Sequence, residues 1–268
     1  MNDTPESEPT ADAPPAPAHS GGWFADLHLA AAFLTRLPLP VAPCGPGGLA
    51  PAMAVFPLVG GAIGATAGLV FLAGFQVLPP LPAALLALAV ATLLTGALHE
   101  DGLADFADGL GARGGREHRL EVMRDSRTGA FGVLALVFGI ALRAACLAAA
   151  PSGWAGFGAL VAAGALARAA FPAVMQALPP ARADGLGAGA GVPDAGVAAR
   201  AAVAALVLAV LGLGPMAALA ALAASAAAAI VLGWLARRAL GGFTGDVLGA
   251  TAQLVEVAVL LAAAVAWR

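Results

Sequence analysis

The chain has 268 residues, of which 60% are hydrophobic and only 11% carry a charged side chain. Soluble domains contain about 25% charged residues, so this composition cannot cover a water-exposed surface of this size. It predicts an all-α, polytopic integral membrane protein that has the lipid bilayer as its main solvent. The formal net charge of −3 is too small to indicate nucleic-acid binding.

The N-terminal segment, residues 1–22, is rich in Pro, Ala and acidic residues and has no apolar core. Such a segment buries little apolar area, so we expect a disordered tail rather than a signal peptide. Residues 23–268 then form a single membrane-embedded domain. Its first stretch, residues 23–37, is too short to span a bilayer and mixes charged with apolar residues. We expect it to be an amphipathic helix at the membrane interface.

Apolar runs separated by short, often proline-containing breaks make up the rest of the chain. A membrane-spanning helix needs about 20 apolar residues, and proline ends helices, so we expect six to seven transmembrane helices. The run at residues 196–213 is the weakest candidate, because Arg200 lies near its start. The runs are residues 53–77, 81–98, 130–149, 154–178, 196–213, 216–235 and 247–267.

The breaks between these runs alternate in charge. Residues 98–128, residues 179–200 and the break at Arg237 hold nearly all the charge outside the tail, and the breaks between them hold none. Two runs separate each consecutive pair of charged breaks, which places all the charged breaks on one side of the membrane. The positive-inside rule makes that side cytoplasmic, in a bacterial inner membrane.

The first charged break contains nearly half of the acidic residues of the chain. Asp101, Asp105 and Asp108 are spaced four and three residues apart, so on a helix they lie within about 60° of one another. Carboxylates on one stripe repel each other, and a divalent cation would neutralise them. Mg²⁺ prefers oxygen ligands and leaves positions for phosphate oxygens. The stripe therefore predicts Mg²⁺-assisted phosphoryl transfer from a diphosphate, with a solvated acidic helix face as the alternative.

Arginines follow the acidic stripe within the same break. Arg124 and Arg127 are predicted to bind phosphate, because a guanidinium can bind phosphate through two hydrogen bonds. Arg116 and Arg119 are interpreted as anchors of the cytoplasmic face that pair with neighbouring glutamates.

Two more arginines, Arg143 and Arg168, lie inside predicted spans, where a charge costs at least about 2.5 kcal/mol. A polar cavity open to the cytoplasm would explain both. The alternative is structural pairing with an acidic residue, for which Asp246 and Glu256 are the candidates. Glycines before Asp246 leave backbone N–H groups free for an anion. Asp246 would also suit the N-cap of the last helix.

These segments together resemble the cobalamin synthase family, the membrane-bound adenosylcobinamide-GDP ribazoletransferases. The Asp-rich motif and the Arg-Asp-Ser-Arg motif, in this order and spacing, are the most specific features. The family resemblance implies a phosphotransferase of EC class 2.7 with Mg²⁺ as its cofactor. A ribose hydroxyl of α-ribazole, or of its 5′-phosphate, would attack adenosylcobinamide-GDP and release GMP. The resembling segments are residues 33–38, 56–60, 99–110, 123–132, 184–187 and 244–250.

The resemblance also implies roles for individual residues. His99 or Asp125 would be the base for the ribose hydroxyl, beside the catalytic aspartates of the stripe. The implied metal ligands are Asp101, Asp105, Asp108 and Asp246. The implied substrate-binding residues are Arg124, Arg127, Arg143, Arg168 and Glu256.

Two positions depart from the family pattern. Glu100 stands where the family usually has an apolar residue, and Gln253 stands where a Glu is usual. The second departure argues against an essential carboxylate at that position and makes Glu256 the better candidate.

Two other functions compete with this interpretation. A CDP-alcohol phosphotransferase is one, because Asp105, Asp108 and the residues up to Arg113 match the start of that family's motif. However, Val122 stands where that motif needs Gly, and only Asp125 follows. An anion transporter is the other, although it would leave the acidic stripe unexplained. The oligomeric state stays open, with a homo-oligomer as one option.

Overall fold

The computed structural model describes residues 22–40, 48–182 and 189–268. Within these ranges every regular element is a helix, and a single bridge pairs Pro180 with Phe243, which confirms the all-α prediction. The predicted tail at residues 1–22, apart from Gly22, and the family-like segment at residues 184–187 lie outside the described residues.

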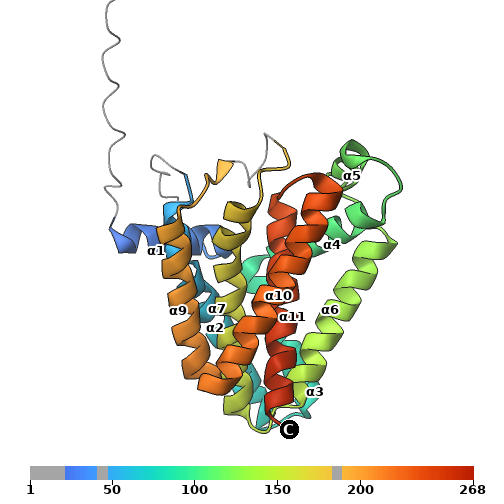
Figure 1. The fold of residues 1–268 in the computed structure, drawn as a ribbon. Coiled ribbons are helices and arrows are strands. Elements are labelled where there is room, and N and C mark those ends of the chain that lie inside the picture. Colours follow the sequence, from blue (N-terminus) through green and yellow to red (C-terminus); the bar gives the residue numbers. More distant parts are fainter. Residues whose placement is uncertain (1–21, 41–47, 183–188) are drawn as a thin grey trace, which may run out of the picture.

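The helices run in chain order from α1 at the N-terminal side to α11 (Figure 1). Their bounds are α1 Trp23–Leu34, η1 Pro51–Val55, α2 Phe56–Phe75, α3 Pro80–Thr95, α4 Leu98–Gly111, α5 Arg116–Val122, α6 Ala130–Ala148, α7 Gly153–Ala177, α9 Ala195–Leu213, α10 Pro215–Leu240 and α11 Gly245–Ala266.

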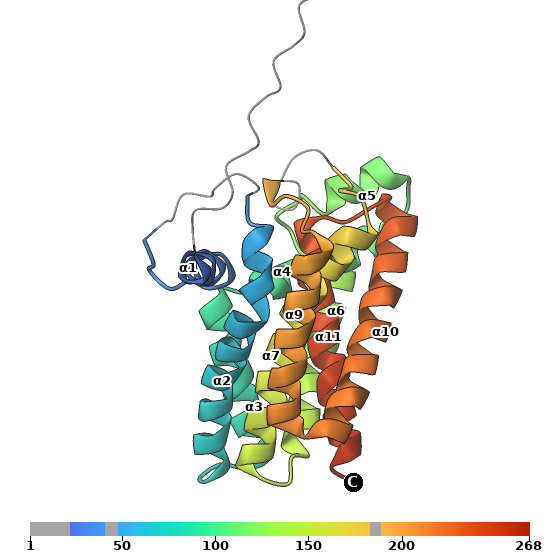
Figure 2. The same ribbon diagram turned by 60° about the vertical axis from the view of Figure 1, so that its left-hand side comes forward.

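Among the described residues, six helices are long and apolar enough to cross a membrane, and seven if the bent pair α3 and α4 is one span. This agrees with the predicted six to seven spans, and the protein is a multi-pass membrane protein. The short helix α1 lies across the direction of the bundle helices and is seen end-on in Figure 2. Trp23 and Phe24 at its start are exposed, as expected for a helix at a membrane interface.

Small residues allow the central helices α2 and α7 to touch through their backbones. A Cβ atom on Gly60 would collide with the carbonyl group of Gly164, and a Cβ atom on Gly64 would collide with Leu160. Membrane helices associate largely through such close packing. Lipid tails are as apolar as the helix surfaces, so the hydrophobic effect does not drive the helices together. The α2–α7 pair therefore forms the centre of the bundle.

A sharp bend separates α3 from α4 and ends the second predicted run at Thr95 rather than at residue 98. The two helices meet at 91°. Gly96 and Ala97 at the bend both have left-handed backbones, with φ of 64° and 59°. The conformation costs Ala97 about 1 kcal/mol, because its Cβ crowds the backbone. Helix α4 thus runs across the upper part of the bundle, packed against α11 and α6 (Figure 1).

The charged connections gather at this same end of the bundle. Helices α4 and α5 and the connection from α10 to α11 lie there, opposite the C-terminus (Figure 1). The connections at the other end are short and uncharged, such as Gly214 between α9 and α10. The predicted alternation of charge is therefore present in the fold, and it separates the two ends of the molecule.

Candidate active site

The candidate site begins at the crossing of α4 and α11, where two glycines touch. A Cβ atom on Gly102 would lie 2.9 Å from the backbone oxygen of Asp246 and 3.2 Å from the Cα atom of Gly249. A Cβ atom on Gly249 would lie 3.3 Å from the Cα atom of His99. The glycines thus let the two backbones approach until the aspartates of α4 face the start of α11.

Four aspartates, three on α4 and one on α11, form what we call the acidic cluster, namely Asp101, Asp105, Asp108 and Asp246. Burial raises the pKa of Asp105 from 3.8 to about 7, and the negative charges of Asp101 and Asp246 add to the rise. Arg182 opposes this rise more weakly. The surroundings of Asp105 therefore disfavour its ionised form.

Asp246 is held by two polar neighbours. The Nη2 atom of Arg182 donates to the Oδ2 atom of Asp246 at 2.7 Å, and the hydroxyl of Thr244 donates to the same oxygen at 3.1 Å. The N-cap of α11 is Thr244, whose Oγ1 atom accepts from the backbone N–H of Val247 at 3.2 Å. The capping alternative for Asp246 is therefore wrong, and its Oδ1 atom makes none of the hydrogen bonds found among the described residues.

Asp108 lies at the other end of the stripe and contacts the start of α6. Its Oδ2 atom accepts from the N–H of Gly129 at 2.6 Å, and its Oδ1 atom accepts from the N–H of Gly132 at 2.9 Å. Free N–H groups at a helix start attract negative charge. Asp108 thus fixes the loop before α6 against α4, in addition to the metal-binding role predicted from the sequence.

The acidic cluster fits a hydrated cation better than a closed metal centre. Within the described ranges, no group of three His, Cys, Asp or Glu side chains is placed to hold a metal ion by itself. Mg²⁺ is commonly held by one or two carboxylates, with water and substrate phosphates as its other ligands. Burial, with the nearby carboxylates adding to it, raises the pKa of Asp105, and such a cation would stabilise its ionised form.

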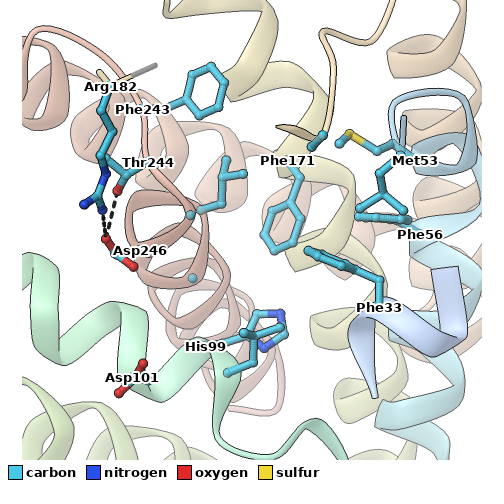
Figure 3. A pocket seen from close by; sticks show the side chains of 16 residues that line it. Phe33, Met53, Phe56, His99, Asp101, Phe171, Arg182, Phe243, Thr244 and Asp246 are labelled. Carbon is cyan, nitrogen blue, oxygen red and sulfur yellow. Dashed lines mark hydrogen bonds and ion pairs between the residues drawn. The ribbon is translucent and has the colours of Figure 1, made fainter. Parts of the chain in front are cut away.

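A cavity of about 210 Å³ opens beside the acidic cluster. Asp101 and Asp246 lie on one side of it, and aromatic side chains from several helices lie on the other (Figure 3). The aromatic and apolar lining comes mainly from Phe33, Met53, Phe56, Phe171 and Phe243. The site thus combines a charged half with an apolar half, and segments far apart in the sequence supply both.

His99 lies at the base of this cavity, near Phe33 and Phe171 (Figure 3). Its side chain is almost fully buried, and neither ring nitrogen has a hydrogen-bond partner among the described residues. Burial lowers its pKa well below the ordinary value, and the charges of Arg168 and Arg143 add to the lowering. The imidazole is therefore neutral at physiological pH.

The Arg-Asp-Ser-Arg motif forms an exposed loop between α5 and α6. Two nitrogens of the Arg127 guanidinium donate to Asp125, the shorter bond measuring 2.6 Å. These hydrogen bonds lower the pKa of Asp125 to about 2. Asp125 is consequently a weak base, although its predicted catalytic role, like the phosphate-binding roles of Arg124 and Arg127, stays a prediction.

The arginines inside the spans meet an acidic partner. The Nη1 atom of Arg143 donates to the Oε2 atom of Glu256 at 2.7 Å, and Arg168 donates to the other oxygen of Glu256. The guanidinium of Arg143 also lies 3.8 Å from the carboxylate of Glu100. We call these four residues the ion-pair network. The structure therefore brings these residues to one another, and their predicted substrate contacts stay predictions.

The two departures from the family pattern are neighbours in space. The side-chain amide of Gln253 donates to the Oε1 atom of Glu100 at 3.1 Å, and Thr92 donates to the same oxygen at 3.0 Å. A carboxylate on α4 and an amide on α11 thus face each other here. Glu100 is the one acidic residue of this contact, and it lies beside Arg143.

Sequence reasoning missed part of the site. Arg182 and Thr244 were not assigned roles, and the aromatic wall was not foreseen. Phe33 and Phe56 do lie inside the family-like segments at residues 33–38 and 56–60, which was the available signal. Phe171 carries no such signal, because it is one apolar residue within an apolar span.

The fold and this site define a membrane-embedded helix bundle that has a charged and an aromatic half of one site at one end. The family model described as cobalamin-5-phosphate synthase matches residues 26–264. The chain belongs to that family.

Curated relatives agree with this assignment. A protein of Bradyrhizobium diazoefficiens is 49% identical over 90% of this chain and 94% of its own length. Proteins of Rhizobium etli and Azorhizobium caulinodans are 46% and 44% identical, over 91% and 89% of this chain and 98% and 94% of their own lengths. All three are named adenosylcobinamide-GDP ribazoletransferase. No solved structure matches the chain.

Proposed function

We propose that this protein joins adenosylcobinamide-GDP to α-ribazole, or to its 5′-phosphate, and releases GMP. The names of its relatives state the donor and the type of acceptor. The observation that carries the proposal is the α4–α11 crossing, which gathers the acidic cluster beside an apolar cavity. A charged diphosphate and an apolar heterocycle can lie next to each other only in such a divided site.

In the proposed reaction a ribose hydroxyl oxygen attacks the phosphorus on the corrinoid side of the diphosphate. A new phosphorus–oxygen bond forms while the bond from that phosphorus to the bridging oxygen breaks. GMP leaves with the electron pair of the broken bond, and the hydroxyl proton passes to a base. Arg182 and Thr244 hold Asp246 at the mouth of the cavity, which fixes one carboxylate of the cluster toward the reacting groups.

Magnesium is part of the proposal as the cofactor. One or two of the carboxylates of Asp101, Asp105, Asp108 and Asp246 would hold it, together with phosphate oxygens of the donor. When bound, Mg²⁺ neutralises charge on the diphosphate and stabilises the leaving phosphate. The raised pKa of Asp105 supports this assignment, because a bound cation would stabilise its ionised carboxylate.

GMP release from adenosylcobinamide-GDP tests the function, with the purified protein in detergent or nanodiscs. We expect release that requires both α-ribazole and Mg²⁺ and stops on chelation. CMP release from a CDP-lipid, with no GMP release, would instead support the CDP-alcohol phosphotransferase alternative. The anion transporter alternative is not favoured, since the carboxylate of Glu256 pairs with both arginines inside the spans.

We also propose that the charged end of the bundle faces the cytoplasm, in the inner membrane of a bacterium. The arginine-rich connections at that end support this orientation. The C-terminus lies at the opposite end (Figure 1), so alkaline phosphatase fused there should be active and a fluorescent protein there should not mature. The reverse result would overturn the orientation and leave the reaction untouched.

A further inference from the structure

The aromatic cavity contains a polar group that the chain does not satisfy. His99 is 1% exposed, and neither its Nδ1 nor its Nε2 atom has a hydrogen-bond partner among the described residues. An unpaired buried polar group costs about 1–3 kcal/mol, so natural proteins rarely leave one without a reason. His99 also lines the cavity, and because both ring nitrogens are buried, a turn of the ring would bring one of them to a ligand there.

The walls around His99 are flat and apolar. Its ring stacks on Phe171 with a centroid distance of 5.9 Å and an interplanar angle of 25°. Phe33 and Phe56 stack on each other at 6.0 Å, and Phe56 meets Phe171 edge-on at 6.1 Å. Figure 3 shows these rings on the side of the cavity away from Asp246. Such walls favour a planar aromatic group with few polar atoms.

Three parts of the proposed substrates are candidates for the aromatic half of the site, namely the corrin ring, the guanine and the base of α-ribazole. The corrin ring is a macrocycle with amide side chains and is too large for a cavity of about 210 Å³. Guanine has several donors and acceptors on its edges, and among the described residues of the aromatic half only His99 has a polar side chain to pair with them. The base of α-ribazole is a dimethylated benzimidazole, which has two fused rings, two methyl groups and one ring nitrogen free to accept a hydrogen bond.

We propose that this cavity binds the benzimidazole base of α-ribazole between its aromatic walls, with an N–H of His99 donating to the free ring nitrogen. This inference rests on the proposed function. It makes His99 a substrate-binding residue that selects the base, in place of the general-base role considered from the sequence. The ribose then lies at the mouth of the cavity, where Thr244 and Asp246 lead to the acidic cluster.

The test compares His99→Leu with the unaltered protein, using GMP release at varied α-ribazole and varied adenosylcobinamide-GDP. We expect the KM for α-ribazole to rise about tenfold, because one hydrogen bond is lost. The KM for adenosylcobinamide-GDP should not change. His118→Leu, at an exposed histidine on α5, is the matched control and should alter neither value. A fall in kcat with an unchanged KM for α-ribazole would overturn the proposal and support a general base.

An acceptor analogue makes the test independent of folding. A dimethylindole riboside has a C–H group in place of the free ring nitrogen and keeps the size and shape of the base. The unaltered protein should bind it about tenfold more weakly than α-ribazole, whereas His99→Leu should bind both equally. Equal discrimination by both proteins would overturn the proposal. Absence of any GMP release by the unaltered protein would instead refute the proposed function.

A second variant tests the aromatic wall. Phe171→Leu removes the ring that stacks on His99 and should raise the KM for α-ribazole about fivefold, with no change for the donor. Phe138→Leu on α6, where the side chain is exposed on the outside of the bundle, is the control. A rise confined to the KM of adenosylcobinamide-GDP would show that the donor's guanine occupies the cavity, and would overturn the proposal.

Discussion

The acidic cluster and the ion-pair network share helix α11 and differ in charge balance. Asp246 belongs to the first and Glu256 to the second, ten residues or about 15 Å further along the helix. In the network, two arginines meet two glutamates, so the charges cancel. In the cluster, Arg182 pairs with Asp246, and burial together with the neighbouring carboxylates raises the pKa of Asp105. A balanced group can stabilise a fold by itself, whereas an unbalanced group needs a partner from outside.

This difference distinguishes two roles of a charged residue in an apolar chain, namely stabilising the fold and binding a ligand. The arginines inside the spans looked functional by default, because an unpaired charge in lipid is costly. Paired with Glu256, they join α6, α7 and α11 and need no ligand. The aspartates at the end of the bundle keep their need for a cation. The following experiments test this division, in order of decreasing expected effect.

Glu256→Gln should have the largest effect, on stability. It leaves two buried guanidiniums without their shared carboxylate, which costs about 3–5 kcal/mol. Thermal unfolding in detergent should show a large fall in Tm, whereas Glu121→Gln at an exposed site on α5 should show almost none. An unchanged Tm with lost activity would contradict a structural role for the ion-pair network and would make it part of the substrate site.

Asp105→Asn should separate activity from stability. We expect GMP release to fall about 100-fold, or about 2.7 kcal/mol, because the cluster loses a cation ligand. The Tm without Mg²⁺ should stay the same or rise, because the substitution removes one of several repelling carboxylates. Glu117→Gln, exposed on α5, is the control. Unchanged turnover would argue against metal binding by Asp105.

Gly102→Ala tests the helix crossing that assembles the cluster. The added Cβ atom would lie 2.9 Å from the backbone oxygen of Asp246, so α4 and α11 must move apart. Such overpacking costs about 1–3 kcal/mol, and we expect about a tenfold loss of GMP release. Gly115→Ala provides the control, because a Cβ atom there meets nothing within 4 Å. Equal effects of the two substitutions would contradict the role of the crossing.

Asp125→Asn should have the smallest effect. We expect GMP release to fall about threefold, to the same extent at each pH. Arg127 lowers the pKa of Asp125 to about 2, so the stabilising contact is complete above the ordinary value of 3.8. It is lost only as the pH falls toward 2. Asp125 itself therefore does not titrate between pH 5 and 9. If the variant removed the acidic limb of the pH–rate profile instead, Asp125 would be the general base.

The sequence was sufficient to predict the helix class, the spans and the charged end, because lipid imposes a long apolar pattern on every span. The spacing of Asp101 and Asp105 also predicted that they share a helix face. The sequence could not show that Glu256 would reach both arginines, since that depends on how α6, α7 and α11 rotate within the bundle. Each of these helices is apolar nearly all round, so its sequence does not reveal its inward face.

The bend after α3 was also beyond sequence reasoning. Ala97 adopts a left-handed backbone that alanine disfavours, so the local sequence does not predict the bend. The bend decides where α4 lies, and hence that His99 faces Phe171 rather than solvent. The aromatic half of the site therefore depends on tertiary structure, whereas the acidic half could be predicted from the spacing of the aspartates.

The separation of charged and uncharged connections has a consequence for how the chain enters the membrane. The connections opposite the acidic cluster are short and carry no charge, so moving them through lipid exposes little more than backbone. The connections beside the cluster contain arginines and aspartates whose transfer would cost several kcal/mol each. Insertion in one direction is therefore cheaper than in the other, so the arginines beside the site favour one orientation before any substrate binds.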